Sequence, residues 1–330
     1  MEALPSSGTT STETAPSTNQ RVPPGAPKSS SANNPDKATT TTAMNSLKRH
    51  VSGHAKKAVE FFKSLGSPKH VVAPMVDQSE QAFRRLTRKY NAHLCYTPMF
   101  NSSKMVHDHR YMAETLQDLN GYTDGDRPLF VQLCGHKPDE LLVAAKAVEH
   151  TADAVDLNLG CPQLIAKRGR YGAFLLEEFD LLQEIVTTLS ENLDIPVTCK
   201  IRVLPSFEKT LELAKLLQAS GCSVLTVHGR TKEEKGSKIG HANWEWIRRI
   251  KEELDIPVIA NGSIGKFEDV HECLEATGCD AVMSSEGVLE NPMLFAGPID
   301  PGTTDIEHFK RRVRPTEFCS CIDVRKFKLN

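Results

Sequence analysis

Eight short apolar runs, each separated from the next by a segment of helical periodicity, restrict the fold of this 330-residue chain more than any other feature. Most positions within a run are apolar, which is typical of strands covered on both faces in a parallel sheet. The runs are 70–75, 92–97, 128–133, 154–159, 196–201, 224–228, 257–261 and 281–285. Alternating strands and helices predict an α/β fold in which helices cover a parallel sheet.

Two short sequences recur along the chain and indicate a repeating unit. Leu-Asp-Ile-Pro-Val occurs at 193–197 and again at 254–258, each time between a helical segment and an apolar run. Ala-Ser-Gly-Cys at 219–222 recurs as Ala-Thr-Gly-Cys at 276–279. Both separations are close to two βα units of about 30 residues each. Eight such units predict a closed (β/α)8 TIM barrel, and the absence of G-x-G-x-x-G after the first run disfavours a dinucleotide-binding open sheet.

The two ends of the chain differ in composition from the segment with the eight runs. Of the first 42 residues, 22 are Ser, Thr or Pro, so this segment has too little apolar surface to offset the entropy of ordering. We expect a disordered tail over 1–46, the barrel over 47–297 and a basic tail over 298–330.

No run is long enough to span a bilayer, and no Cys or His residues have the spacing of a zinc site. We therefore expect no membrane, no metal, and a cytoplasmic or nuclear location.

Polar residues gather where the expected strands end. In a TIM barrel these carboxyl ends meet at one rim, which carries the catalytic residues. The polar residues at the run ends are Asn158, Cys161, Lys200, Arg202, His228 and Arg230. Glycine-containing loops follow the last two runs, at 261–265 and 285–287, where barrels of this kind commonly grip a phosphate through backbone N–H groups. The sequence thus predicts a phosphorylated substrate or cofactor.

Six motifs at these strand ends resemble those of the tRNA-dihydrouridine synthases. They are A-P-M at 73–75, V-Q-L at 131–133, N-L-G-C-P at 158–162, C-K-I-R at 199–202, V-H-G-R at 227–230 and A-N-G at 260–262. The resemblance extends from about Lys69 to Phe295, and the sequences at 158–163 and 286–292 look most like the eukaryotic tRNA-dihydrouridine(16/17) synthase branch. It implies an enzyme that binds FMN, takes electrons from NADPH or NADH, and reduces the C5–C6 double bond of uridine in tRNA.

The resemblance also implies roles for individual residues. The isoalloxazine ring of FMN would be lined by Pro74, Met75 and Val76, and its polar edge bonded by Gln132. Lys200 and His228 would lie near the flavin and the uracil. The ribityl phosphate would be held by Asn261, Gly262, Ser263, Glu286 and Gly287. Bacterial members usually carry Arg at the position of Glu286, so this phosphate grip would differ in detail.

The same resemblance places the uridine beside Asn158 and Arg202 and makes Cys161 the proton donor. Addition of hydride at C6 leaves negative charge towards C5 and O4, and a thiol that is protonated at neutral pH can protonate C5. Lys200 and Arg202 could stabilise that charge. A stacked uridine must swing out of the folded tRNA to react. Basic residues on neighbouring loops (167–170, Lys232, Lys235 and Lys238) would then contact tRNA phosphates.

Three alternatives stay open. The chain could be an FMN barrel that acts on a free pyrimidine, as dihydroorotate dehydrogenases do. Lys200 at a strand end could instead form a Schiff base in an aldolase-type barrel. A catalytically inactive fragment that binds RNA or a protein through its tails is the third. The family normally continues into a helical tRNA-binding domain, whereas only 33 residues follow Gly297 here.

Overall fold

The computed structural model describes residues 53–120, 125–236 and 239–298. The expected disordered tail over 1–46 lies outside these residues, as does the expected basic tail after Pro298. None of the described helices is long and apolar enough to cross a membrane.

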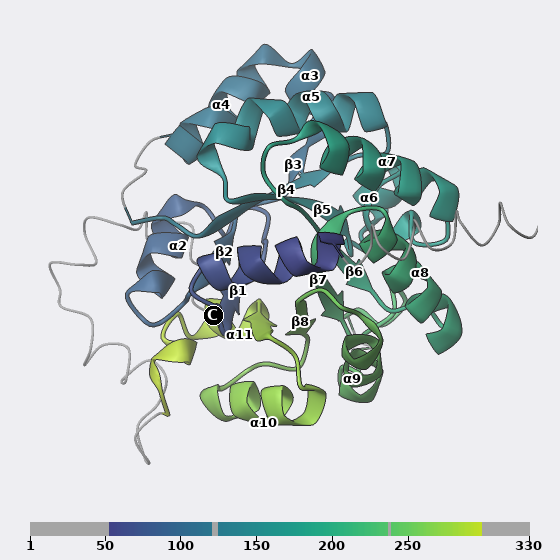
Figure 1. Ribbon diagram of the computed structural model, residues 1–330. Coiled ribbons are helices and arrows are strands. Elements are labelled where there is room, and N and C mark those ends of the chain that lie inside the picture. Colours follow the sequence, from purple (N-terminus) through teal and green to yellow (C-terminus); the bar gives the residue numbers. More distant parts are fainter. Residues whose placement is uncertain (1–52, 121–124, 237–238, 299–330) are drawn as a thin grey trace, which may run out of the picture. The chain divides into compact units, whose positions relative to one another are not determined.

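Eight parallel strands form a closed barrel (Figure 1). They are β1 (His70–Val72), β2 (Leu94–Tyr96), β4 (Leu129–Cys134), β5 (Ala154–Leu159), β6 (Val197–Arg202), β7 (Cys222–His228), β8 (Val258–Asn261) and β9 (Ala281–Ser284). Each pairs with the next, and β9 pairs with β1, which closes the barrel. The short strand β3 (Phe100–Asn101) pairs with the end of β4. The predicted TIM barrel is confirmed.

Helices surround the barrel (Figure 1), and most of them bury an apolar face. They are α2 (Gln81–Arg88), α3 (Ser102–His107), α4 (His109–Asn120), α5 (Pro138–Val148), α6 (Leu164–Arg168), α7 (Phe179–Asn192), α8 (Phe207–Ala219), α9 (Trp244–Glu253), α10 (Phe267–Thr277) and α11 (Glu286–Glu290). Local signals set several of their ends. Pro138 starts α5, and the Ser206 hydroxyl caps α8 by accepting from the Lys209 N–H. Gly278, with φ of 63°, ends α10 in the left-handed conformation that glycine adopts readily.

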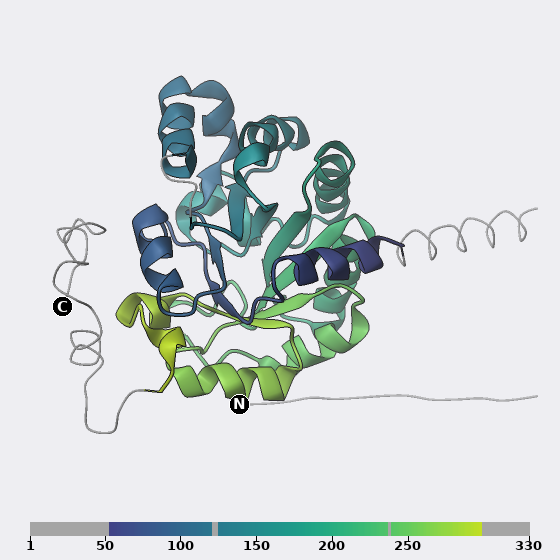
Figure 2. The same ribbon diagram turned by 60° about the vertical axis from the view of Figure 1, so that its left-hand side comes forward.

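One further helix, at residues 53–64, crosses the end of the barrel where the strands begin (Figures 1 and 2). The Phe61 ring stacks on Phe130, near the start of β4, with 6.0 Å between ring centroids. The His54 ring hydrogen-bonds the carbonyl of Cys222, the first residue of β7. This helix therefore covers the amino ends of the strands, and the opposite rim carries the candidate site.

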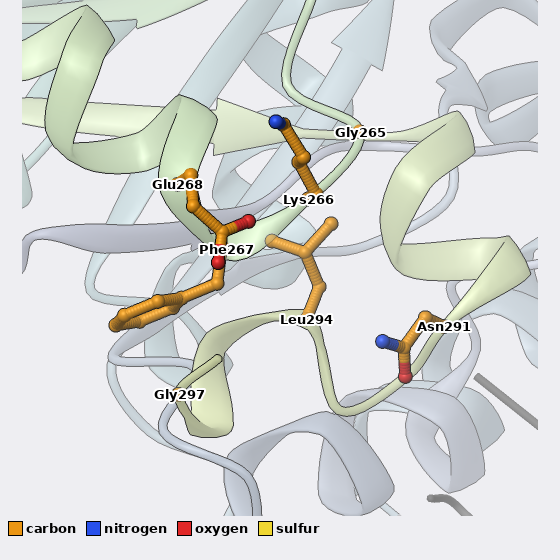
Figure 3. Close-up of a pocket in the computed structure, with 7 residues that line it drawn as sticks. All are labelled: Gly265, Lys266, Phe267, Glu268, Asn291, Leu294 and Gly297. Carbon is orange, nitrogen blue, oxygen red and sulfur yellow. The ribbon is translucent and has the colours of Figure 1, made fainter. Parts of the chain in front are cut away.

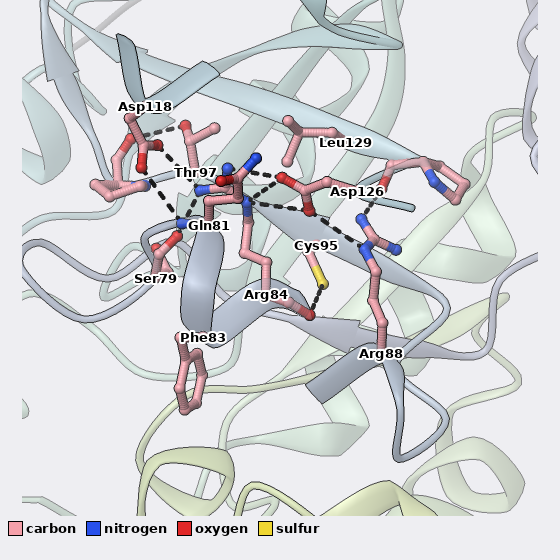
Figure 4. A network of polar contacts seen from close by, with 12 residues as sticks. Ser79, Gln81, Phe83, Arg84, Arg88, Cys95, Thr97, Asp118, Asp126 and Leu129 are labelled. Atoms are coloured by element: carbon pink, nitrogen blue, oxygen red, sulfur yellow. Dashed lines mark hydrogen bonds and ion pairs between the residues drawn. The ribbon is translucent and has the colours of Figure 1, made fainter. Parts of the chain in front are cut away.

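A buried ion-pair network holds the loop that follows β1 (Figure 4). The Arg84 side chain is fully buried, and its Nη2 lies 2.8 Å from Asp126 Oδ2. Its Nη1 donates to Asp118 at 3.2 Å and to the Ser79 carbonyl at 2.8 Å. The Ser79 hydroxyl in turn hydrogen-bonds both the N–H and the carbonyl of Met75. Burial works to lower the pKa of Arg84, but the carboxylates of Asp126 and Asp118 together outweigh it and raise that pKa.

Removal of this arginine tests how much of the fold depends on the network. Arg84→Met should lower the free energy of unfolding by about 3–5 kcal/mol, because it leaves the buried Asp126 carboxylate without its main partner. Arg110→Met is the control, since Arg110 pairs with Glu114 on the surface and should change stability very little. Urea unfolding followed by circular dichroism measures both. Equal effects of the two substitutions would contradict this account.

Candidate active site

Polar side chains on alternate residues of adjacent strands form three rows that rise towards the carboxyl-end rim. Alternate residues of a strand point to the same side, and in a closed barrel one side is the interior. A hydrogen bond of 3.3 Å between Tyr96 on β2 and Thr226 on β7, two strands that are not neighbours, crosses this interior. The rows, read from the strand registers, are Gln132, Asp156 and Thr198; then Asn158, Lys200 and Thr226; then Arg202, His228 and Asn261.

The lowest row is a hydrogen-bonded network around the fully buried carboxylate of Asp156. Thr198 Oγ1 donates to Asp156 Oδ1 at 2.7 Å, and Gln132 Nε2 donates to Asp156 Oδ2 at 2.8 Å. Gln132 Oε1 accepts from Asn158 Nδ2 at 2.7 Å. Burial raises the pKa of the Asp156 carboxyl to about 6. Gln132 and Asn158, assigned from the sequence to cofactor and substrate, are thus bonded to each other.

The loop that follows β5 carries Cys161, and side chains of other residues hold its backbone through hydrogen bonds. Asn158 Oδ1 accepts from the N–H groups of Gly160 and Cys161 at 3.1 and 3.0 Å. Arg202 Nε donates to the Gly160 carbonyl at 2.9 Å. Lys235 Nζ donates to the Pro162 carbonyl at 2.6 Å. The position of the thiol is therefore fixed by residues of three different segments.

Cys161 is the half-buried cysteine among the seven that the structure describes, and the other six are buried. It packs beside Cys134 of β4 and Tyr171. Burial, and next the charge that Cys161 can carry, raise the pKa of Cys134 to about 12, so Cys134 stays protonated at neutral pH. Cys161 is consequently the described thiol best placed to react with a molecule at the rim.

Lys200 lies in the middle row, and its Nζ donates to Oδ1 of Asn261 in the row nearest the rim at 2.8 Å. Burial, and next the charge of Arg202, lower the pKa of Lys200 to about 8, so the amine still carries its charge at pH 7. Burial and the neighbouring cations Lys200, Arg202 and Arg230 hold the pKa of His228 well below its usual value. Arginine can only donate, so Arg230 Nη1, 3.2 Å away, donates to His228 Nε2. The site thus combines three cations with a neutral histidine.

A cavity of about 170 Å³ lies where β7, β8 and β9 end. Six residues predicted from the sequence line it: His228, Asn261, Gly262, Ser263, Glu286 and Gly287. Arg230, noted at a strand end but given no role, lines it as well and donates to Ser263 Oγ at 3.1 Å. Its position two residues after His228 in V-H-G-R was the signal that could have assigned it to the site.

Two glycines of this cavity, Gly262 and Gly287, are required by close packing. A Cβ at Gly262 would lie 2.8 Å from the His228 ring, and one at Gly287 would lie 2.5 Å from the Ile264 carbonyl oxygen. Gly262 also has φ of 108°, a conformation that side chains rarely permit. The cavity with its arginine and close backbone fits a phosphate group, and the exposed carboxylates of Glu286 and Glu290 are the charges in its lining that oppose it.

The loop after β1 carries the three residues predicted to line the flavin ring, and they differ in exposure. Met75 is buried and Pro74 half-buried, whereas Val76 is 55% exposed. Ser79 and Arg84 hold the loop through their hydrogen bonds to each other and to Met75. The start of the loop lies beside β9, because the Ala73 N–H donates to the Ser284 carbonyl. Pro74, Met75 and Val76 are therefore placed at the same rim as the cavity.

A second cavity, of about 300 Å³, adjoins the first and shares Gly265 with it (Figure 3). Its other lining residues come from the start of α10 and from the segment after α11: Lys266, Phe267, Glu268, Asn291, Leu294 and Gly297. Within the described ranges, no group of three or more His, Cys, Asp or Glu side chains could hold a metal ion.

Comparison with known sequences gives the family. A sequence model described as Dihydrouridine synthase (Dus) matches residues 71–325. The chain belongs to the dihydrouridine synthase family. The resemblance of its strand-end motifs to this family is thus confirmed.

Named dihydrouridine synthases of several organisms are similar to this chain. The rat tRNA-dihydrouridine(16/17) synthase-like protein is 52% identical over 238 residues, which cover 71% of this chain and 53% of the rat protein. The Saccharomyces cerevisiae tRNA-dihydrouridine(16/17) synthase is 47% identical over 257 residues, 77% of this chain and 59% of the yeast protein. The human tRNA-dihydrouridine(20a/20b) synthase-like protein is 38% identical over 246 residues, 73% of this chain and 75% of the human protein. The chain spans little more than half the length of the rat and yeast relatives.

A solved structure shares the fold of this dihydrouridine synthase family member. The 6-hydroxypseudooxynicotine amine oxidase of Pseudomonas geniculata N1 matches with a TM-score of 0.54 and 10% identity, over 68% of this chain and 46% of that chain. At this identity the likeness concerns the barrel fold alone.

The buried carboxylate predicts a pH-dependent stability. Asp156 has a pKa of about 6 in the folded protein and 3.8 as its reference value, so the unfolded chain gives up this proton first and stability falls as pH rises from 4 to 6. The difference amounts to about 3 kcal/mol. Asp156→Asn removes it, so the melting temperature of the variant relative to wild type should rise between pH 4.5 and pH 7.5 in differential scanning fluorimetry. An offset that stays constant over this range would contradict the expectation.

Proposed function

We propose that this protein reduces the C5–C6 double bond of uridine in tRNA to give dihydrouridine. The observation that carries the proposal is the half-buried Cys161 beside the cations Lys200 and Arg202, at the same rim as a phosphate-sized cavity, in a chain of the dihydrouridine synthase family. The names of the relatives, which include tRNA and NAD(P), support the choice of substrate and reductant.

FMN is the cofactor that the cavity suits. When bound, it supplies the hydride for C6 of the uracil and is reduced again by NADPH or NADH. Its phosphate would be held by Arg230, Asn261, Gly262, Ser263 and Gly287, with Glu286 beside them. Pro74, Met75 and Val76 would line its ring, and Gln132 would reach the polar edge with the second N–H of its amide.

The chain's own residues supply the proton and the electrostatic stabilisation. Cys161 gives its thiol proton to C5, so that together with the hydride two hydrogens are added across the double bond. The resulting thiolate then takes a proton from water. Lys200 and Arg202 stabilise the negative charge that develops towards O4, and Asn158 and Arg202 contact the uridine. His228, neutral at pH 7, lies near the uracil without adding a further charge.

The surface next to Cys161 suits a single nucleotide displaced from a folded RNA. On α6, Leu164 and Ile165 are 66% and 67% exposed, and Lys167 is exposed beside them. Arg170 and Lys232 are paired with Glu178 and Glu177, so they offer less charge to tRNA than the sequence implies. Lys238 lies outside the described residues. We assign the exposed cations of α6 to tRNA phosphates and place the protein in the cytoplasm or the nucleus, where tRNA occurs.

Family membership favours this reaction over an aldolase-type Schiff base on Lys200. Reduction of a free pyrimidine and a catalytically inactive fragment are the remaining competitors. The choice of substrate separates the first from the proposal, and the absence of any reduced product would favour the second. The proposal predicts reduction of uridines in tRNA and none of uridine monophosphate.

Substitution of the thiol gives the decisive variant. Cys161→Ala should keep its flavin but form dihydrouridine at least about 100-fold more slowly, because C5 loses its proton donor. Cys273→Ala, which removes a buried thiol on α10, should retain wild-type activity. Mass spectrometry of nucleosides from tRNA incubated with enzyme and NADPH measures the product. Full activity of Cys161→Ala would refute the role of the thiol, and product from uridine monophosphate alone would refute the role of tRNA.

A further inference from the structure

We infer that Asp156 is a positioning residue for Cys161 and acts through Gln132 and Asn158. This set of three residues, the Asp156 relay, runs inside the barrel from β5 to β4 and back to β5. The inference relies on the proposed function only for what Cys161 does, since the hydrogen bonds themselves are independent of the reaction.

The relay consists of three consecutive links between buried atoms. Asp156 Oδ2 accepts from Gln132 Nε2 at 2.8 Å, and Gln132 Oε1 accepts from Asn158 Nδ2 at 2.7 Å. Asn158 Oδ1 then accepts from the N–H groups of Gly160 and Cys161 at 3.1 and 3.0 Å. Asp156 and Gln132 are fully buried and Asn158 is 8% exposed, so water does not compete for these links.

The acceptor at Asp156 sets the direction of the whole relay. An acceptor at this end requires the NH2 group of Gln132 to face it, which turns Oε1 towards Asn158. Asn158 must then present its own NH2 group to Gln132 and its oxygen to the loop. With both amides reversed, the NH2 group of Asn158 would face two backbone N–H donors, and neither would have an acceptor. Asp156 thus determines which atom of Asn158 meets the Cys161 loop.

The remaining contacts of the loop hold its carbonyl groups. Arg202 donates to the carbonyl of Gly160, Ala173 N–H to that of Cys161 and Lys235 to that of Pro162. The relay supplies the acceptor, Asn158 Oδ1, for the N–H groups of Gly160 and Cys161. Without it, the peptide that carries Cys161 loses its acceptor on one side and can rotate, which moves the thiol away from the rim. A displacement of about 1 Å at a reacting group can lower a rate by about 100-fold.

Two substitutions of Asp156 separate its role as an acceptor from its charge. In Asp156→Asn, the side-chain oxygen can still accept from Gln132 while the NH2 group donates to Thr198 Oγ1, which can accept. This variant should keep kcat within about threefold. Asp156→Leu offers no acceptor, so kcat should fall by about tenfold or more. Thr277→Val, which removes a buried hydrogen bond on α10 outside the rows of the site, is the control and should change kcat little.

The rate at which iodoacetamide alkylates Cys161, followed by peptide mass spectrometry, reports the position of the thiol without any substrate. Asp156→Leu should change this rate at least threefold, whereas Asp156→Asn and Thr277→Val should leave it near that of wild type. If Asp156→Leu does not fold, Gln132→Met breaks the next link and should give the same change. Flavin content is measured alongside, because Gln132 is also a predicted flavin contact.

The inference is overturned if a folded Asp156→Leu, or Gln132→Met in its place, has wild-type kcat and alkylation rate. It is also overturned if Asp156→Asn is as impaired as Asp156→Leu, since charge and not the acceptor would then matter. A wild-type protein that reduces no tRNA uridine would refute the proposed function, while the alkylation rates would still decide whether the relay holds Cys161.

Discussion

The closed parallel pairing of eight short strands is the constraint on which every other feature depends. Pairing of β9 with β1 and of β2 with β4 leaves no gap in the barrel, so all eight strands end at one rim. Residues more than one hundred positions apart, such as Cys161 and Glu286, thereby reach the same end of the fold. The helix at 53–64 covers the other end, so the polar interior is accessible only from the rim. The location of the site follows directly from the topology.

The sequence predicted the eight strands well because each is an apolar run between helical segments. The last residue of a strand is harder to predict, because a run can stay apolar after the backbone has left the sheet. The run 70–75 becomes strand only over His70–Val72, since Met75 bonds to Ser79 and not to a neighbouring strand. Between β2 and β4 the chain forms β3, α3 and α4 where the alternation predicts a single helix. Short elements of this kind depend on tertiary contacts more than on local pattern.

The family motifs located most rim residues, but not what those residues touch. Gln132 and Asn158 stand 26 positions apart on neighbouring strands, and their hydrogen bond becomes visible only when the register is known. The pairing of Arg84 with Asp126 likewise joins a helix to a distant loop. The position of Arg230 two residues after His228 indicates the rim, but its hydrogen bond to Ser263 Oγ is visible only in the structure. Such long-range polar contacts, and the pKa values that follow from them, require the three-dimensional arrangement.

The central claim is that the rim formed by β7, β8 and β9 binds the phosphate of a flavin. Isothermal titration of the flavin-free protein with FMN and with riboflavin, which lacks the phosphate, tests it most directly. The account predicts that FMN binds at least about 100-fold more tightly, from charge-assisted hydrogen bonds worth about 3 kcal/mol, and that Arg230→Met removes much of this preference. Equal affinity for the two flavins, or binding of neither, would contradict it.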